Sequence, residues 1–177
     1  MADLKQDYYF EFVPQRERAR GASIDWKSYN ALLSVVLTYS ATEARLSRFL
    51  AKWDLFPSAF NLLAILARTD GEGMHLSRIS ELLAVSRANV TGLVDVLARK
   101  DLVHRVASET DRRVRLAQLT PAGAQLIQEI LPEYYAFNRS LFESIPDSDM
   151  ETVTDVLRKM RNLMEEQDDS PTTASVT

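Results

Sequence analysis

Residues 76–97 read LSRISELLAVSRANVTGLVDVL, and this stretch decides the fold. Ile79 and Leu83 stand one turn apart, as on the buried face of a short first helix. Ser86 can cap a second helix with its hydroxyl. The second helix is then anchored to a core by three apolar residues, Val90, Leu93 and Leu97. This arrangement is typical of a helix-turn-helix.

The opposite face of the second helix carries small and hydrogen-bonding side chains. Such side chains suit a surface that enters the major groove of DNA. A glycine such as Gly92 costs about 1 kcal/mol in a helix interior. Close approach to a sugar-phosphate chain would explain its presence, although a chance substitution at a surface position would explain it too. Periodicity alone leaves two ordinary core helices as an equal alternative. The residues expected to contact DNA from this motif are Ser77, Ser86, Arg87, Ala88, Asn89, Thr91 and Gly92.

A short β-hairpin is predicted directly after the helix-turn-helix. Residues 102–106 form a short strand candidate, and residues 114–119 alternate as a half-buried strand does, with a polar loop between them. Arg113 at the loop tip can enter a narrow minor groove, where the potential is most negative, and Arg112 stands beside it. Asp111 can pair with Arg113 and hold the loop in shape. A hairpin in this position favours a winged helix-turn-helix over two core helices.

Long amphipathic helices flank this motif. Apolar residues recur at helical spacing from Trp26 to Trp53 after a cap at Ser23 or Asp25, and a shorter helix starts at Pro57. Helical spacing resumes after Thr120-Pro121, and Pro132 is expected to kink that helix. A last amphipathic helix spans residues 150–164. The predicted fold class is mostly α with a small β wing.

We expect a single winged helix-turn-helix domain at residues 26–165. Residues 1–25 show no clear period and read as an N-terminal extension. Residues 166–177 are acidic and then rich in Ser and Thr, which is typical of a disordered tail. Within the domain, the DNA-binding lobe is predicted at about 55–120 and the dimerisation helices at about 26–53 and 121–165.

The charge of the chain is unevenly distributed. The 177 residues carry a net charge of −4. Residues 76–115 hold eight basic and five acidic residues, which gives +3 and leaves −7 for the rest. The positive charge is therefore concentrated in the motif, although an ordinary solvated surface would have the same composition.

Composition excludes several classes of function. The chain has no cysteine, which rules out disulfides, thiol catalysis and cysteine-bound zinc. His75 and His104 stand in different patterns, so no metal and no cofactor are expected. No apolar run of about 18 residues and no secretory signal is present, so we expect a cytoplasmic protein. Ser86, His75 and Asp111 form no catalytic spacing and no phosphate loop occurs, so an enzyme is not expected.

These motifs resemble the MarR family of bacterial and archaeal regulators. The resemblance rests on residues 76–86 and 90–97, on Lys100-Asp101-Leu102-Val103, on Asp111-Arg112-Arg113 and on the segment from Leu116 to Gly123, and covers about residues 26–165. It implies a homodimer whose first and last helices form a base, with two winged lobes on a pseudo-palindromic duplex operator. We expect a repressor.

Some positions depart from the family pattern. Ala84 replaces the common turn glycine, which makes a left-handed turn conformation costlier. Ser80 replaces the usual alanine. Phe56 stands where a capping Ser or Thr is common, so Ser58 is expected to cap instead. None of these residues removes a feature that contacts DNA.

The resemblance also implies a ligand site, because small aromatic anions often bind between the dimer base and the lobe in this family. We therefore expect a small aromatic acid or phenol to release the DNA. Core or dimer packing is the alternative role for the same aromatic residues. Alternative functions are a winged-helix protein–protein adaptor and a constitutive DNA binder. The residues expected near the ligand are Trp26, Tyr29, Tyr39, Arg45, Trp53 and Phe60, with Arg48 and Phe56 nearby.

Overall fold

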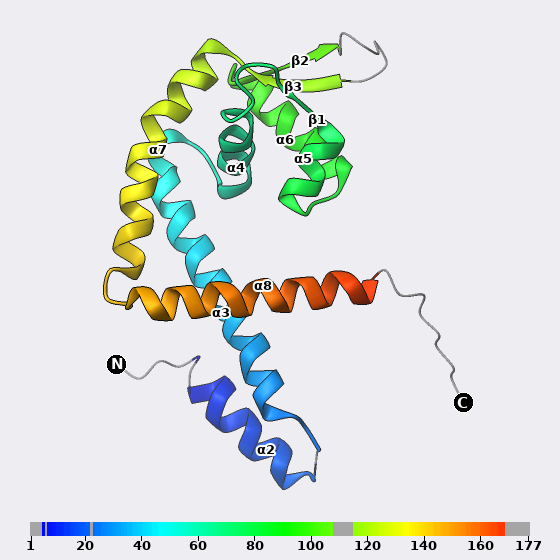
Figure 1. Ribbon diagram of the computed structural model, residues 1–177, viewed down its shortest axis with the longest axis vertical. Helices are drawn as coiled ribbons and strands as arrows, with labels where there is room; N and C mark the ends of the chain where they lie inside the picture. The colour runs from blue at the N-terminus through cyan, green and yellow to red at the C-terminus, as the bar shows by residue number, and fades with distance from the viewer. Residues whose placement is uncertain (1–4, 6, 22, 108–114, 169–177) are drawn as a thin grey trace, which may run out of the picture. The chain divides into compact units, whose positions relative to one another are not determined.

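The computed structural model describes residues 5, 7–21, 23–107 and 115–168 (Figure 1). The chain forms two compact units, residues 1–127 and 128–177. The fold is mostly helical with a small antiparallel sheet, which confirms the predicted fold class. The elements in chain order are η1 (Asp7–Phe12), α2 (Val13–Ala19), α3 (Trp26–Leu50), η2 (Ala51–Trp53), α4 (Pro57–Leu66), β1 (Met74–His75), α5 (Leu76–Leu83), α6 (Arg87–Arg99), β2 (Val103–Ala107), β3 (Arg115–Leu119), α7 (Pro121–Phe142) and α8 (Asp147–Asp168).

Helix α3 begins at a capping aspartate. Asp25 accepts hydrogen bonds from the Lys27 backbone N–H at 3.1 Å and from the Ser28 hydroxyl at 2.6 Å. The Ser28 hydroxyl bond, followed by the backbone bonds, holds the pKa of Asp25 below its ordinary value. The helix ends at Leu50, and the last three residues of the predicted helix form the tighter turn η2.

The core of the first unit lies where α4, α5, α6 and the sheet meet. Helix α6 buries positions 90, 94 and 97, so Val94 replaces Leu93 among the expected anchors, and Leu93 is half-buried. Helix α4 begins after Phe56, which makes no side-chain cap bond, and Ser58 lies inside the helix rather than at its cap. The largest fully buried side chains of this core are Leu50, Phe60, Leu62, Leu63, Leu66, Ile79, Val90, Val94, Leu97 and Val103.

The sheet has three antiparallel strands in the order β1-β3-β2. The predicted hairpin is present, with Val103 opposite Leu119 and Ala107 opposite Arg115. Strand β1 was not predicted, because two residues are too short to show a period. Gly73 precedes it at φ +78°, and a Cβ there would lie 2.7 Å from the Ala117 carbonyl oxygen. The close approach of the turn to β3 therefore requires glycine.

The N-terminal extension contains helix, which its aperiodic sequence did not predict. Pro14 of α2 is buried, and the rings of Tyr8 and Phe12 stack at 5.6 Å between centroids. The Arg18 guanidinium lies 5.5 Å from the Trp26 ring centroid. Contacts between aromatic and basic side chains, rather than an apolar stripe, accompany this helix.

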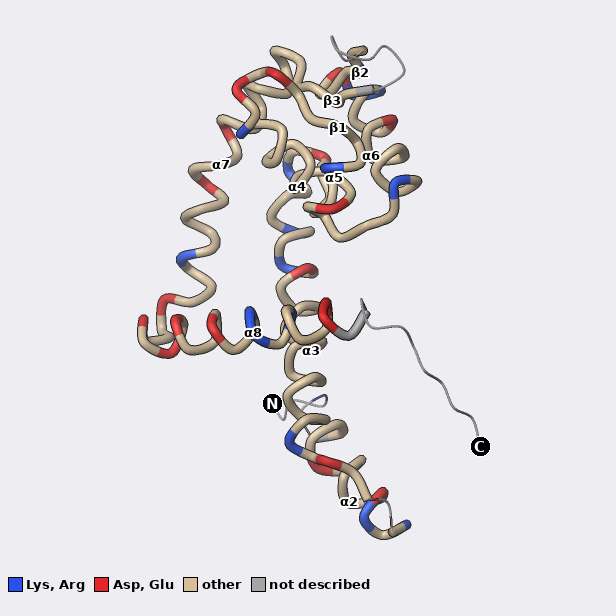
Figure 2. The backbone as a smooth tube through the Cα atoms, turned by 45° about the vertical axis from the view of Figure 1, so that its right-hand side comes forward, with Lys and Arg blue, Asp and Glu red and all other residues tan. Residues whose placement is uncertain are grey.

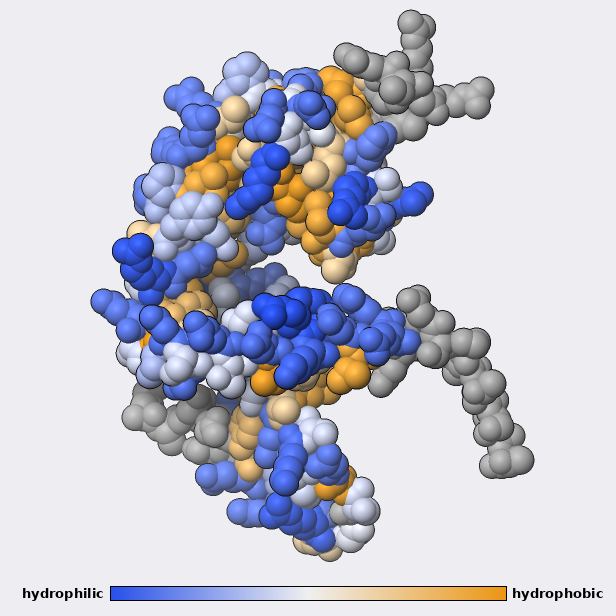
Figure 3. Space-filling view, in the orientation of Figure 1, coloured by the Kyte–Doolittle hydropathy of each residue, from blue (hydrophilic) through white to orange (hydrophobic). Residues whose placement is uncertain are grey.

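The second unit contains the rest of α7 and all of α8. Helix α7 continues through Pro132. Helix α8 is longer than predicted at both ends and includes residues 166–168, which were expected to be disordered. In Figure 3 polar side chains cover the visible face of α8, and apolar side chains gather along one edge. The large apolar side chains that α8 leaves exposed are Val153, Val156, Leu157, Leu163 and Met164.

No single one of the described helices is long and apolar enough to cross a membrane. Two consecutive helical segments, Trp26–Trp53 and Pro57–Leu66, meet at 72°. Together they match a membrane span, but by length and composition only.

Candidate nucleic-acid interface

Helices α5 and α6 are joined by a tight turn at residues 84–86. Ala84 adopts the left-handed conformation at φ 51°, ψ 43°. Its N–H donates to the Glu81 carbonyl at 3.2 Å, and the Val85 N–H donates to the Ser80 carbonyl at 3.1 Å. An L-residue in this conformation costs about 1–2 kcal/mol. The turn therefore has the expected geometry, at a cost that glycine would avoid.

Ser86 caps α6, as its position predicts. Its side-chain oxygen accepts the Asn89 backbone N–H at 3.2 Å. The cap leaves the other N–H groups of the first turn directed out of the helix end, where the partial positive charge favours an anion such as a phosphate. The first turn of α6 is thus suited to the DNA backbone.

The face of α6 opposite the core is exposed and has small or polar side chains. Thr91 Oγ1 donates to the Arg87 carbonyl at 3.0 Å, so this hydroxyl is engaged within the helix. The side of the helix that faces away from Val90 and Leu97 can approach a groove without apolar obstruction. The expected contact residues that are exposed on α6 and its cap are Ser86, Arg87, Ala88, Asn89, Thr91 and Gly92.

Most basic side chains near this face are already paired with carboxylates. Arg105 lies 2.6 Å from Asp95, and Lys100 lies 2.5 Å from Asp54. Figure 2 shows basic positions along the backbone around α5 and α6. Within residues 76–107, all of which the structure describes, Arg87 and Arg99 make no ion pair. Arg87 is therefore the unpaired cation at the start of α6.

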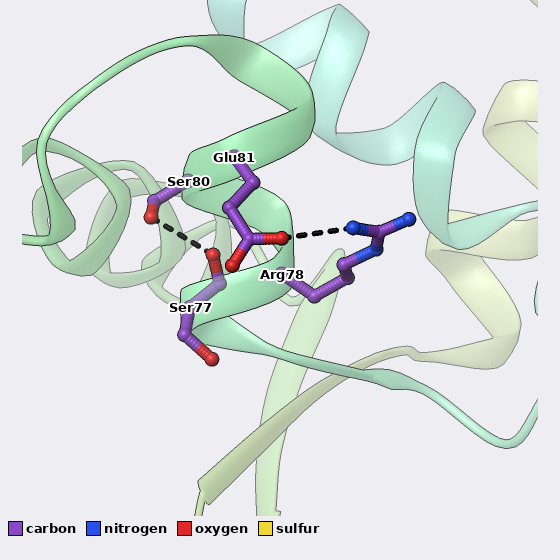
Figure 4. Close-up of polar contacts among 4 residues, drawn as sticks. All are labelled: Ser77, Arg78, Ser80 and Glu81. Carbon is purple, nitrogen blue, oxygen red and sulfur yellow. Dashed lines mark hydrogen bonds and ion pairs between the residues drawn. The ribbon is translucent and has the colours of Figure 1, made fainter. Parts of the chain in front are cut away.

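Helix α5 contributes a second polar cluster, shown in Figure 4. Ser77 is half-buried, and its carbonyl accepts the Ser80 hydroxyl at 2.9 Å. Arg78 and Glu81 pair at 2.8 Å with both side chains 61% exposed. Such an exposed pair is worth about 1 kcal/mol or less, so Arg78 can exchange Glu81 for a phosphate. Arg78 was not among the contact residues expected from the sequence.

The wing loop lies outside the described residues. Asp111, Arg112 and Arg113 fall in residues 108–114, so their roles remain predictions. The strands that carry the loop are described. Their register pairs Ala107 with Arg115, the last described residue before the loop and the first one after it.

The start of α7 is locked onto the turn after α6. Thr120 Oγ1 donates to the Asp101 carbonyl at 2.6 Å and accepts the Gly123 N–H at 3.0 Å. The Thr120 N–H donates to the Leu102 carbonyl at 3.1 Å. A Cβ on Gly123 would lie 2.0 Å from that same carbonyl oxygen. This contact gives a physical reason for the Leu-Thr-x-x-Gly pattern at residues 119–123.

The residues expected at a ligand site do not form one cluster. Phe60 is only 1% exposed and belongs to the core, whereas Tyr39 is 64% exposed. Trp26 packs against Tyr29 at 5.4 Å, at the start of α3. Trp53 lies just beyond the other end, about 40 Å away at the rise of an α-helix. Trp26 and Trp53 of one chain therefore cannot contact the same small ligand.

The C-terminal end of α3 does combine aromatic and cationic groups. The rings of Phe49 and Trp53 meet at 5.3 Å, and Lys52 Nζ lies 4.0 Å from the Trp53 ring centroid. Arg45 and Arg48 are exposed one to two turns earlier. This end of α3 could stack an aromatic ring and pair with its anionic group.

Among residues 5, 7–21, 23–107 and 115–168, no group of three or more His, Asp or Glu side chains lies together in a way that could hold a metal ion.

Gly92 gives a test of close approach to DNA. A Cβ at Gly92 would meet nothing within 4 Å. Gly92→Ala is therefore expected to stabilise the free protein by about 1 kcal/mol, because alanine favours the helix. We expect the same variant to bind duplex DNA about tenfold or more weakly, because the methyl group would fill the contact. Thermal unfolding and fluorescence anisotropy measure the two effects, and unchanged DNA affinity would show that Gly92 lies away from the duplex.

Comparisons with known proteins agree with this geometry. Residues 53–114 match the model of the MarR family. The HTH-type transcriptional regulator MhqR of Bacillus subtilis is 27% identical over 134 residues, which cover 76% of this chain and 91% of that protein. The transcriptional repressor MprA of Escherichia coli is 25% identical over 109 residues, which cover 62% of each chain.

Two solved structures share the fold. MepR of S. aureus, in a DNA complex, has a TM-score of 0.69 at 20% identity and covers 77% of this chain and 97% of its own. CouR from Rhodococcus jostii, bound to p-coumaroyl-CoA, has a TM-score of 0.64 at 26% identity and covers 77% of this chain and 92% of its own.

The fold and the exposed, capped second helix define a winged helix-turn-helix protein that binds DNA. The family model covers the lobe, and the relatives extend the likeness to most of the chain. Residues 53–114 thus match the MarR family, and the two relatives are named as a transcriptional regulator and a transcriptional repressor.

Proposed function

We propose that two copies of this chain bind a pseudo-palindromic duplex operator. Each α6 enters a major groove, and the two half-sites are about 10 bp apart, because a two-fold dimer presents its recognition helices one helical turn apart. Arg113 of each wing enters the adjacent minor groove. The observation that carries the proposal is Arg87, exposed and unpaired at the serine-capped start of α6.

Exposed apolar side chains support the dimer. On α3, Leu32, Val36 and Tyr39 follow one stripe and are each more than half exposed. Helix α8 exposes a second apolar stripe in the other unit. Apolar surfaces of this extent mark interfaces, and a second copy would cover both. Light scattering at micromolar concentration tests this, and a monomer under those conditions contradicts the proposal.

Base preference should depend on the start of α6. Arg87→Ala and Asn89→Ala are each expected to relax selectivity at particular positions by about 1–3 kcal/mol, because these side chains can read base edges. Arg113→Ala should instead weaken binding to all sequences. In-vitro selection followed by anisotropy separates the two patterns. Arg99→Ala, at the far end of the same helix, is the charge-matched control. If Arg87→Ala behaves as this control does, the recognition face is misassigned.

We propose further that a small aromatic acid or phenol releases the DNA. The paired rings of Phe49 and Trp53, with Lys52 beside them and Arg45 one helical turn before Phe49, offer a stacking surface and cations for an acidic group. The CouR structure supports this ligand class, because p-coumaroyl-CoA carries a phenolic ring. A tenfold loss of DNA affinity requires only about 1.4 kcal/mol of differential ligand affinity between the two states of the protein.

The two tryptophans make the ligand site testable. We expect benzoate, salicylate, hydroxybenzoate or cinnamate analogues at millimolar concentration to quench Trp53 fluorescence and release the operator. Trp26→Phe should retain this quenching, and Trp53→Phe should lose it. The gel shift of the same samples reports DNA release. If no compound quenches fluorescence or releases DNA, the alternative of a constitutive binder is favoured.

We propose that the protein represses transcription. MprA is named a transcriptional repressor, and a dimer seated on an operator would block access to a promoter. A reporter fused to the selected operator should be silenced by the protein and restored by Arg87→Ala. A winged-helix adaptor without DNA binding would leave the reporter unchanged.

A further inference from the structure

Arg105 of β2 reaches two acceptors on α6. Its guanidinium Nη2 lies 2.6 Å from Asp95 Oδ1 and 3.3 Å from the Thr91 carbonyl oxygen, to which it donates. The two acceptors lie one helical turn apart. The backbone of Arg105 pairs with Ala117, a fully buried residue of the central strand β3. One side chain therefore joins the recognition helix to the sheet that carries the wing.

The position of Asp95 is electrostatically unfavourable for a protein that binds DNA. Arg87, Thr91 and Asp95 follow one another at intervals of four residues, so they share one stripe of α6. A carboxylate on this stripe would repel phosphates unless a cation neutralised it. The planar guanidinium can hold a carboxylate and a carbonyl together, whereas a lysine ammonium offers no fixed fork. Arg105 thus neutralises Asp95 and fixes the helix in the same contact.

We propose that Arg105 and Asp95 form a clamp that positions α6 relative to the wing and thereby sets sequence selectivity. The inference rests on the proposed function. The clamp keeps one spacing between the element in the major groove and the element in the minor groove, and Arg105 acts as a positioning residue rather than as a phosphate contact. The side chains are 36% and 45% exposed. A pair of this exposure adds little to folding stability, so its effect appears in selectivity.

The test is the affinity of the full-length protein for its selected operator divided by its affinity for a scrambled duplex. On charge alone, Asp95→Asn would tighten both complexes and preserve this ratio. If the clamp sets selectivity, its loss should instead lower the ratio about tenfold or more in both Asp95→Asn and Arg105→Met. The ratio of the double variant should be no lower than that of either single variant, because the two substitutions break the same contact. Arg105→Lys should fall between wild type and Arg105→Met.

The matched controls are Asp155→Asn and Arg158→Met, which break an Arg–Asp pair of 2.9 Å on α8 with the same changes in charge. They should leave the ratio unchanged. Melting temperatures of the clamp variants should stay within about 3 °C of wild type. If Arg105→Met does not fold, Asp95→Asn and Arg105→Lys are judged by the same criteria.

Three results overturn the clamp alone: a wild-type ratio in Asp95→Asn, additive losses in the double variant, or an equal loss in the α8 controls. A wild-type protein without any sequence selectivity overturns the proposed function and the clamp with it.

Discussion

Gly123→Ala is expected to lower the stability of the lobe by about 3 kcal/mol or more, at or above the top of the usual range for overpacking. The added Cβ would lie 2.0 Å from the Leu102 carbonyl oxygen and 2.9 Å from its carbon. That carbonyl cannot move away freely, because it accepts the Thr120 N–H. The strain therefore falls on the junction between β2 and the start of α7.

Thermal unfolding measures this effect. A chain of this length loses about 2–4 °C of melting temperature for each 1 kcal/mol, so a drop of about 6–12 °C is expected. Gly92→Ala is the matched control, since it adds the same methyl group in open space and should raise the melting temperature slightly. A Gly123→Ala protein that melts at the wild-type temperature would contradict the packing described for this junction.

Operator affinity is expected to fall about 10³-fold between about 50 and 200 mM salt, as for a protein that neutralises about six phosphates. A dimer would provide these cations from three arginines in each copy, namely Arg87, Arg112 and Arg113. The whole chain has a net charge of −4, so binding must depend on these local cations rather than on the net charge. The described cations Arg105 and Lys100 contribute less, because each is paired with a carboxylate.

The measurement is the slope of log affinity against log salt, which should be near −5 for about six contacts. Arg87→Ala should reduce the magnitude of that slope by about 2 in a dimer, because both copies lose a cation. Arg20 follows the last residue of α2 and pairs with Glu17 at 2.9 Å. Arg20→Met changes the net charge equally and should leave the slope unchanged. A slope near zero in wild type would argue against binding to the DNA backbone.

The sequence by itself determined the local elements of this protein. The apolar spacing in residues 76–97 predicted both helices of the helix-turn-helix, and Ser86 predicted the cap. The strand candidate at residues 102–106 and the alternation in residues 114–119 predicted the hairpin strands to within a residue. Each of these features depends on neighbours within about four residues, where side-chain periodicity and capping chemistry are decisive.

Only the tertiary structure decided features that join distant residues. Strand β1 exists because β3 offers it a partner, and no local period marks two residues. Val94 rather than Leu93 is fully buried on α6, because the neighbouring elements set how the helix is rotated. The pairing of Arg105 with Asp95 and the contact of Gly123 with Leu102 also needed the fold. Long-range packing fixes such contacts, because the free energy that selects them comes from residues that the local sequence does not contain.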